Sequence, residues 1–380
     1  MDHSATTPVA PEVLEAMLPY FGERFGNASS LHGYGLEAKE ALEESREKVA
    51  RLLGAEPEEM VFTSGGTESD NLALKGIARR SKEKGKHIIT SCVEHPAILE
   101  TCRNLQKEGF EVTYLPVTSD GMVDLAALES AIRPDTILIS IMHANNEIGT
   151  IQPLEEISRM AAEEDIFLHT DAVQSVGKIA VDVNALGVDL LSISAHKLYG
   201  PKGVGALYIR KGTRLESIMQ GGGHERGLRS GTENVAGIVG LAKAAELAAE
   251  SIAIEGPRLT QLRDRLATAV LDKVKDAWIN GSMKRRLPSN LNFGFKYVEG
   301  ESLLLYLDSK GIAVSTGSAC SSHKLEPSHV LLSLGLKPEE CHGSLRITIG
   351  MSNTIEEVDF VADCITEAVN RFRGISALGR

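Results

Sequence analysis

The chain has 380 residues, of which 42% are hydrophobic and 24% charged, so it is long enough to bury a large core and form two domains of a soluble globular protein. Its formal net charge of −12 at pH 7 argues against direct binding to nucleic acid or to an anionic membrane, because both depend on clustered Lys and Arg. The five cysteines are odd in number and contain no Cys-x-x-Cys pair, which argues against a disulfide framework or an intrinsic zinc site and favours a reducing cytoplasm.

The N-terminal part of the chain carries two features that we assign no separate function. Residues 1–8 lack the basic and apolar regions of a secretory signal. Residues 33–38 read Gly-Tyr-Gly-Leu-Glu-Ala and open a predicted helix, as in a dinucleotide-binding site. That pattern means little without a preceding strand, and none is predicted here, so we do not assign a nicotinamide site.

Between about residues 60 and 210, short β-rich segments alternate with helical patterns. This alternation predicts βαβ units around a mostly parallel sheet, and therefore an α/β fold. The expected strands are Met60–Thr63, His87–Ser91, Glu111–Leu115, Thr136–Met142, Ile166–His169, Asp189–Ile193 and Gly205–Ile209. Helices are expected to begin near Thr67, Pro96, Asp124 and Pro153.

The first candidate site element is the run Ser-Gly-Gly-Thr-Glu-Ser at residues 64–69, between a predicted strand and a predicted helix. The bare amides around Gly66 and the hydroxyl of Thr67 would meet the positive end of the helix dipole, which suits an anion. A glycine turn with Thr67 as an ordinary helix cap is at least as common, so the run alone does not distinguish an anion site from a structural turn.

Two further polar residues are expected where strands end. Asp171 follows an apolar strand with Gln174 three residues on, and a carboxylate there can keep a pyridinium nitrogen protonated. His95 precedes a helix and could stack on a flat ring. Each also has a structural interpretation, Asp171 as a helix cap and His95 as a loop histidine.

Lys197 lies in the run Ser194-Ala195-His196-Lys197, directly after a predicted strand. Burial would lower the pKa of this lysine and make it a Schiff-base nucleophile, while Ser194 and His196 could bind a phosphate. Taken alone, the run fits a partly buried lysine paired with a carboxylate equally well.

The second half of the chain predicts a smaller α+β unit. After a glycine-rich loop at residues 221–231 come two helical patterns, about Glu233–Ser251 and Pro257–Lys275, whose charged residues make a membrane span unfavourable. Then we expect strand Leu291–Phe295, helix Glu301–Ser309, strand Ile312–Ser315, helix Pro327–Leu334, strand Ser344–Ile349 and helix Ile355–Phe372. We predict a large domain at residues 10–250 and a small domain at residues 251–380, which the segment 1–9 joins.

Cys320 lies in a run of small residues, Ser-Thr-Gly-Ser-Ala-Cys-Ser-Ser at 315–322, which suits a mobile loop. Its thiolate could attack the sulfur of a substrate. A buried, inert role fits Cys364 and Cys92 better, and Cys341 is either a second thiol or a core residue.

The order of these motifs resembles that of the fold-type I pyridoxal-phosphate enzymes of the class V aminotransferase superfamily. The glycine cradle, His95, the Asn-Asn-Glu run at 145–147, Asp171-x-x-Gln174 and the Lys197 run occur in sequence, each after a predicted strand. More closely, the chain resembles the cysteine desulfurases that supply sulfur for iron–sulfur clusters, from Asp2-His3-Ser4-Ala5-Thr6-Thr7-Pro8 to Arg346. The run around Cys320 is similar to that of the long-loop group.

The resemblance implies pyridoxal 5′-phosphate as cofactor, held on Lys197 as a Schiff base. His95 would stack on the ring and act in catalysis, Asp171 would pair with the ring nitrogen, and Gln174 would bond the phenolic oxygen. The remaining implied cofactor contacts are Gly66, Thr67, Asn145, Ser194 and His196, with Thr232 reaching the partner's phosphate in a homodimer. Arg346 would clamp the substrate carboxylate with help from Asn145.

The function that follows is an L-cysteine desulfurase. Lys197 would move the proton at Cα, and Cys320 would accept sulfur as a persulfide, which leaves L-alanine. An iron–sulfur scaffold or another acceptor protein would then collect the sulfur. A selenocysteine lyase or a small-amino-acid aminotransferase on the same cofactor is the alternative enzyme, and a binding protein that only docks to a sulfur-relay partner is the non-enzymatic one.

Overall fold

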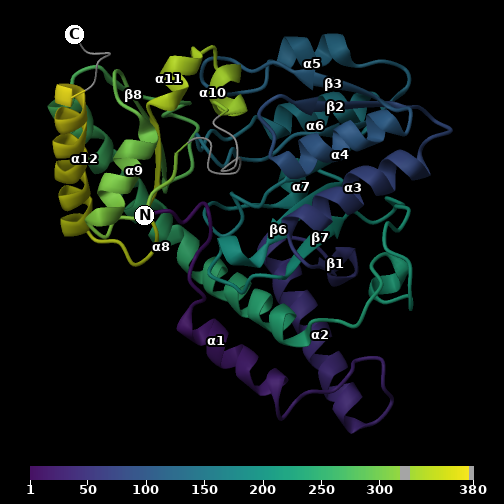
Figure 1. The fold of residues 1–380 in the computed structure, drawn as a ribbon. Helices are drawn as coiled ribbons and strands as arrows, with labels where there is room; N and C mark the ends of the chain where they lie inside the picture. Colours follow the sequence, from purple (N-terminus) through teal and green to yellow (C-terminus); the bar gives the residue numbers. More distant parts are fainter. Residues whose placement is uncertain (317–325, 376–380) are drawn as a thin grey trace.

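A computed structural model describes residues 1–316 and 326–375 (Figure 1). Within them, seven strands form one large sheet: β1 (Met60–Thr63), β2 (His87–Ser91), β3 (Glu111–Leu115), β4 (Thr136–Ser140), β5 (Phe167–Asp171), β6 (Leu190–Ser194) and β7 (Gly205–Ile209). Their order is β1-β7-β6-β5-β4-β2-β3, in which β7 runs antiparallel to β1 and β6 and every other neighbouring pair is parallel. The predicted α/β fold with a mostly parallel sheet is confirmed.

The large sheet is buried on both faces. Neighbouring residues of one strand, such as Leu190 and Leu191 in β6, belong to two different apolar clusters. This explains why strands such as β4 and β6 are apolar runs without alternation, whereas β3, at the edge of the sheet, is partly exposed. The helices of this part are α1 (Pro11–Met17), α2 (Gly33–Leu53), α3 (Gly66–Arg80), α4 (Pro96–Lys107), α5 (Leu125–Ala131), α6 (Leu154–Glu163) and α7 (Val183–Leu186).

The helix starts expected from the sequence agree closely with the structure. Helix α4 begins at Pro96, the side chain of Asp124 caps α5, and Pro153 precedes α6. Proline suits the first turn because its missing N–H has no partner there anyway. Helix α2 begins at Gly33 and follows a short 3₁₀ turn and a loop, so the dinucleotide-like pattern there has no preceding strand.

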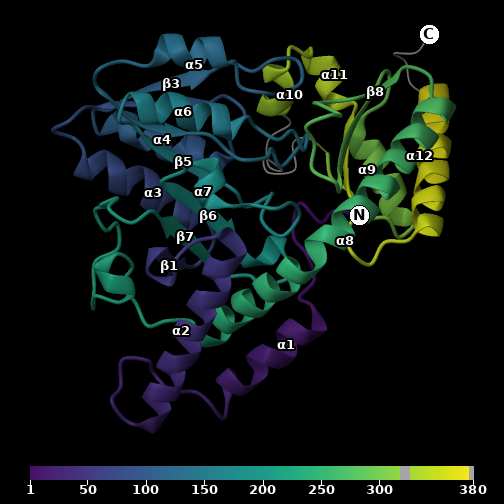
Figure 2. The ribbon, with the colours of Figure 1, turned by 180° about the vertical axis from the view of Figure 1, so that it is seen from behind.

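A second apolar cluster supports a three-stranded antiparallel sheet in the order β10-β9-β8. The elements here are β8 (Ala277–Ile279), β9 (Asn290–Phe295), α9 (Gly300–Ser309), α10 (His329–Ser333), α11 (Pro338–His342), β10 (Ser344–Thr348) and α12 (Ile355–Ile375). Seen from behind in Figure 2, α12 lies beside α9. The expected strand Ile312–Ser315 is wrong, because only Ser315 pairs there, as an isolated bridge to Arg346.

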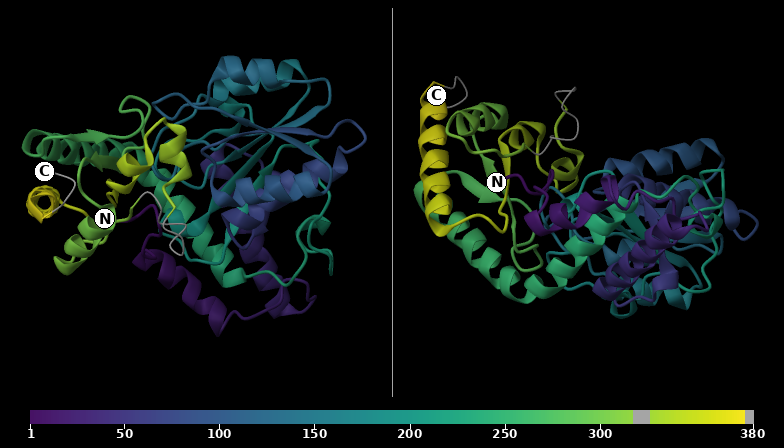
Figure 3. Two further views of the ribbon diagram at one scale, coloured as in Figure 1. Left: turned by 45° about the horizontal axis from the view of Figure 1, so that its top comes forward. Right: turned by 90° about the horizontal axis from the view of Figure 1, so that it is seen from below.

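One helix, α8 (Val235–Lys273), connects the two parts, where the sequence predicted two helices. Pro257 lies inside it, and it contacts α2 in the first part and α12 in the second. Because packing on both sides holds the backbone helical, the amide that proline lacks does not end the helix. Figure 3 shows α8 curving as it passes from one part to the other. The expected division near residue 250 falls within this helix.

Within the described ranges, no helix combines the length and the apolar character that crossing a lipid bilayer requires.

Candidate active site

A cavity of about 330 Å³ opens where the parallel strands of the large sheet end. Asp171 is the last residue of β5 and Ser194 the last of β6, while His95 follows β2 after a short turn. Ligands of open α/β sheets bind at such carboxyl ends. The structure brings nine of the predicted site residues to this cavity: Gly66, Thr67, His95, Asp171, Gln174, Ser194, His196, Lys197 and Arg346.

The glycine cradle forms the turn between β1 and α3. Gly65 has a φ of 151°, and α3 begins at Gly66 with no side-chain cap on its first amides, so the alternative interpretation of Thr67 as an ordinary helix cap does not apply. A Cβ on Gly66 would lie 2.7 Å from Cγ2 of Val173, so only bare backbone fits here. The free N–H groups and the helix dipole make this corner suitable for an anion.

Asp171 is a buried carboxylate that faces the cavity. Its Oδ1 accepts a hydrogen bond of 2.9 Å from the backbone N–H of Val173 in a turn. In the part of the chain that the structure describes, no helix begins directly after Asp171, so the alternative interpretation of this residue as a helix cap does not apply. Burial raises the pKa of Asp171, while the nearby His95 and Lys197 oppose that rise. The pKa of its neighbour Asp70 is raised well above the usual range by burial and by Asp171. A cation brought to Asp171 would therefore be bound tightly in this poorly solvated place.

His95 combines a structural role with a place in the cavity wall. Its Nδ1 accepts a hydrogen bond of 3.1 Å from the N–H of Ala97 in the first turn of α4. Burial lowers the pKa of His95. A neutral ring with Nδ1 as acceptor carries its proton on Nε2. The ring is thus held in one orientation at the cavity, with an N–H on its far edge.

Lys197 reaches the N-terminal segment from a 3₁₀ turn after β6. Its ammonium donates hydrogen bonds to the carbonyl oxygens of Ser4 and Ala5, the latter at 2.8 Å. The same segment is bonded to His196, whose carbonyl oxygen accepts from the N–H of Thr7 at 2.9 Å. Ser4 and Ala5 therefore form part of the cavity wall.

Lys178 supports the site through Gln174, a role that the sequence did not indicate. Its ammonium donates to Oε1 of Gln174 at 2.9 Å, and Nε2 of Gln174 donates to the carbonyl of Ser4 at 3.0 Å. Burial, with the charges of Lys197 and Arg346, lowers the pKa of Lys178 to about 7. The lysine fixes which way the Gln174 amide points. The spacing of four residues carried no signal, because it brings side chains together only on a helix and residues 172–178 are not helical.

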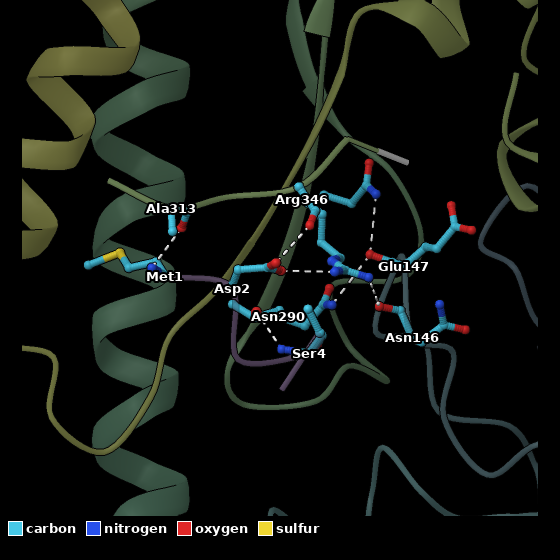
Figure 4. Close-up of polar contacts among 12 residues, drawn as sticks. Met1, Asp2, Ser4, Asn146, Glu147, Asn290, Ala313 and Arg346 are labelled. Carbon is cyan, nitrogen blue, oxygen red and sulfur yellow. Dashed lines mark hydrogen bonds and ion pairs between the residues drawn. The ribbon is translucent and has the colours of Figure 1, made fainter. Parts of the chain in front are cut away.

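Arg346 enters the cavity from β10 in the second part of the chain (Figure 4). Its Nη2 pairs with the carboxylate of Asp2 at 2.9 Å, and its Nη1 donates to the carbonyl of Asn146 at 3.2 Å. The guanidinium is almost fully buried, which strengthens its attraction for an anion.

Asn145 does not contact the cavity, and the expectation for it requires correction. Its Nδ2 donates to the carbonyl of Val93, and its Oδ1 accepts from the N–H groups of Glu147 and Ile148, so the amide is already used. The neighbouring Asn146 lines the cavity instead. The sequence does not tell which of two adjacent asparagines in a turn faces the cavity, because this depends on the backbone geometry.

Two other predicted residues are not placed at this cavity. Thr232 is exposed in the loop before α8 and does not line it. Cys320 lies outside the described residues. The described cysteines are free thiols, and burial raises the pKa of Cys341 to about 11, which suits a core residue and not a nucleophile.

Comparison with known proteins places the chain in a family. Residues 1–361 match the model of the aminotransferase class-V family. A cysteine desulfurase IscS of Dictyoglomus turgidum is 56% identical over 376 residues, which cover 99% of this chain and 95% of that protein. A cysteine desulfurase IscS of Methanosarcina thermophila is also 56% identical, over 100% of this chain and 93% of that protein.

Solved structures agree with the sequence relatives. A NifS-like protein superposes with a TM-score of 0.92 at 42% identity, covering 97% of this chain and 98% of that chain. SspA in complex with cysteine superposes with a TM-score of 0.82 at 40% identity, covering 92% of this chain and 97% of that chain. This chain is therefore an enzyme of the aminotransferase class-V family and belongs, within it, to the cysteine desulfurases, which are pyridoxal-phosphate enzymes.

Proposed function

We propose that the chain is an L-cysteine desulfurase that binds pyridoxal 5′-phosphate in the cavity at the strand ends. The observation that carries the proposal is that one cavity holds a lysine, a buried carboxylate, an anion cradle and an arginine. When bound, this cofactor supplies an electron sink that stabilises negative charge on the Cα of an amino acid. The relatives named cysteine desulfurase and the cysteine complex of SspA support cysteine as the substrate.

The donor set of the cavity fits this cofactor. The phosphate would be held by the first amides of α3 with Thr67, Ser194 and His196, where bare backbone at Gly66 is required. Asp171 would hold a proton on the ring nitrogen, and the Nε2 of Gln174 would donate to the phenolic oxygen. His95 would stack on the ring. Lys197 supplies the amine that links the cofactor to the chain.

The chemical step divides between two residues of this chain. The Lys197 amine takes the proton from Cα of cysteine and returns one to carbon. The thiolate of Cys320 forms a sulfur–sulfur bond with the substrate, and the carbon–sulfur bond breaks. The bonding electrons remain on Cβ, which gains a proton and yields alanine. Arg346 binds the substrate carboxylate through charge-assisted hydrogen bonds.

We also propose a homodimer in the cytoplasm that passes its sulfur to an acceptor protein, such as an iron–sulfur scaffold. Free thiols suit a reducing compartment. Large apolar side chains exposed before and at the start of α2, among them Phe25 and Leu31, support a covered surface, and Thr232 would touch the partner's phosphate. Sedimentation should then give twice the 40.9 kDa of one chain, and a monomer would contradict the dimer.

Replacing the sulfur acceptor separates this function from its alternatives. The variant Cys320→Ala should lower alanine and sulfide formation from L-cysteine by at least about 100-fold, because the attacking thiolate is lost. The absorbance of the cofactor should stay unchanged. Cys92→Ala, which removes a half-buried free thiol, is the matched control and should keep full activity. Full activity in Cys320→Ala would contradict the proposal and favour a lyase or aminotransferase.

A further inference from the structure

The carboxylate of Asp2 contacts the arginine that we assign to the substrate. Oδ1 of Asp2 lies 2.9 Å from Nη2 of Arg346, and Figure 4 shows the two side chains meeting directly. The side chain of Arg346 is 4% exposed and that of Asp2 is 21% exposed. A pair this poorly solvated interacts more strongly than an exposed one, provided that its geometry is held.

The backbone holds Asp2 in register with Arg346. Asp2 forms a parallel β-bridge with Thr348, which lies two residues after Arg346 on β10. The N–H of Thr348 donates to the carbonyl of Met1 at 2.9 Å, and the N–H of Ser4 donates to Oγ1 of Thr348 at the same distance. The strand that carries the arginine therefore also places the carboxylate.

The second oxygen of Asp2 is also bonded. Oγ of Ser315 donates to Oδ2 of Asp2 at 2.8 Å. The backbone of Ser315 pairs with that of Arg346, through bonds of 2.7 and 3.2 Å. Arg346, Asp2 and Ser315 thus form a closed set in which each residue restrains the other two.

The location of Asp2 distinguishes a supporting role from competition with the substrate. Arg346 lines the cavity, whereas Asp2 is not among the residues that line it. Among the described residues, Nε of Arg346 is buried and has no hydrogen-bond partner. A buried N–H without a partner is costly, and a ligand that accepts from it removes that cost.

We propose that Asp2 is a positioning residue for substrate recognition: from outside the cavity it orients the guanidinium of Arg346, so that the unused donors face the substrate carboxylate. The proposal deepens the proposed function and rests on its assignment of Arg346 as the carboxylate clamp. Without Asp2, the Arg346 side chain loses its fixed orientation. Binding a carboxylate must then also order this side chain, and the lost entropy weakens the binding.

The test measures ligand binding and not turnover. The enzyme loaded with pyridoxal 5′-phosphate is titrated with L-alanine and with L-alaninamide, which lacks the carboxylate, and the cofactor absorbance reports each Kd. Asp2→Asn should raise the Kd of L-alanine about tenfold, equivalent to about 1.4 kcal/mol. The Kd of L-alaninamide should change by less than about twofold, since it makes no ion pair with Arg346.

Three further variants make the result specific. Asp359→Asn removes a carboxylate from the exposed ion pair with Arg265 and should change neither Kd. Arg346→Gln should abolish the tighter binding of L-alanine relative to L-alaninamide. Adding Asp2→Asn to Arg346→Gln should not raise the Kd of L-alanine further. If Asp2→Asn does not fold, Ser315→Ala should show a smaller weakening in the same direction. Cofactor content and the thermal midpoint check folding.

The contradicting outcomes are distinct. If Arg346→Gln removes the preference for L-alanine but Asp2→Asn and Ser315→Ala leave it intact, the positioning role is wrong and the proposed function stands. Tighter binding of L-alanine to Asp2→Asn would also overturn it, because Asp2 would then compete with the substrate. If Arg346→Gln itself keeps the preference, the clamp assigned under the proposed function fails, and the role of Asp2 fails with it.

Discussion

Two side chains in the cavity wall also hold the local backbone. Asp171 accepts a backbone hydrogen bond in a turn and still faces the cavity, and His95 caps α4 while its ring contributes to the wall. Residue type and position after a strand were enough to predict these two. They were not enough for Asn145, Asn146 or Lys178, whose side-chain directions depend on the path of the backbone.

His169, two residues before Asp171 in β5, provides a pH prediction at the residue scale. Burial alone lowers the pKa of His169 to about 3, from 6.5 in an unfolded chain. Between about pH 3 and pH 6.5, His169 is protonated in the unfolded state and neutral in the folded state. The free energy of unfolding therefore decreases as the pH falls below 6.5. From pH 6.5 to pH 5 this single group should account for about 2 kcal/mol.

Urea unfolding gives the free energy of unfolding at pH 7 and at pH 5, and the difference between the two values measures this effect. His169→Gln loses hydrogen bonds to Ser140 and Ser192, so it should be less stable at both values, but its further loss on acidification should be smaller than that of the wild type. His342→Gln, at an exposed position, should behave like the wild type. An equal acid-induced loss in wild type and His169→Gln would contradict the assignment.

At the scale of elements, the sequence predicted the seven strands of the large sheet better than the small sheet, where the expected strand Ile312–Ser315 is only an isolated bridge. Most strands of the large sheet were recognised from their apolar runs, because burial on both faces leaves a strong signal, and the edge strand β3 from its β-branched and aromatic residues. The prediction divided α8 at Pro257, since proline usually ends a helix, and tertiary packing overrides that preference here. Strand β8, three residues long, carries too little pattern to be recognised.

The turn before α3 gives a prediction at this scale. Gly66→Ala should be destabilised by about 1–3 kcal/mol and should lose cofactor more readily, because the new Cβ would lie 2.7 Å from Val173 Cγ2 and narrow the cradle. Gly33→Ala, at the start of α2 with open space around it, is the control and should be neutral. Unfolding and cofactor dissociation are measured together. Unchanged retention of cofactor in Gly66→Ala would contradict the role of the cradle.

At the scale of the whole molecule, the site depends on segments that are far apart in the sequence. Arg346 of the second part, Lys197 of the first and the N-terminal residues Ser4 and Ala5 meet at one cavity. The family resemblance, which rests on the order of the motifs, predicted that Lys197 and Arg346 share one site. The ion pair between Asp2 and Arg346 could be found only from the structure. We propose that the boundary between the two domains lies within α8. The N-terminal segment bonds to both parts: Met1 and Asp2 to the smaller one, and Ala5 and Thr7 to the larger one.

The central claim is that Cys320 takes sulfur from L-cysteine in a site built around Lys197. Mass spectrometry of the cofactor-loaded enzyme after addition of L-cysteine tests it most directly. We predict one extra sulfur on the peptide that contains Cys320, together with the formation of alanine, and no such sulfur on the peptides of Cys92 or Cys341. Alanine formation with the extra sulfur on another cysteine, or with none on Cys320, would contradict the account.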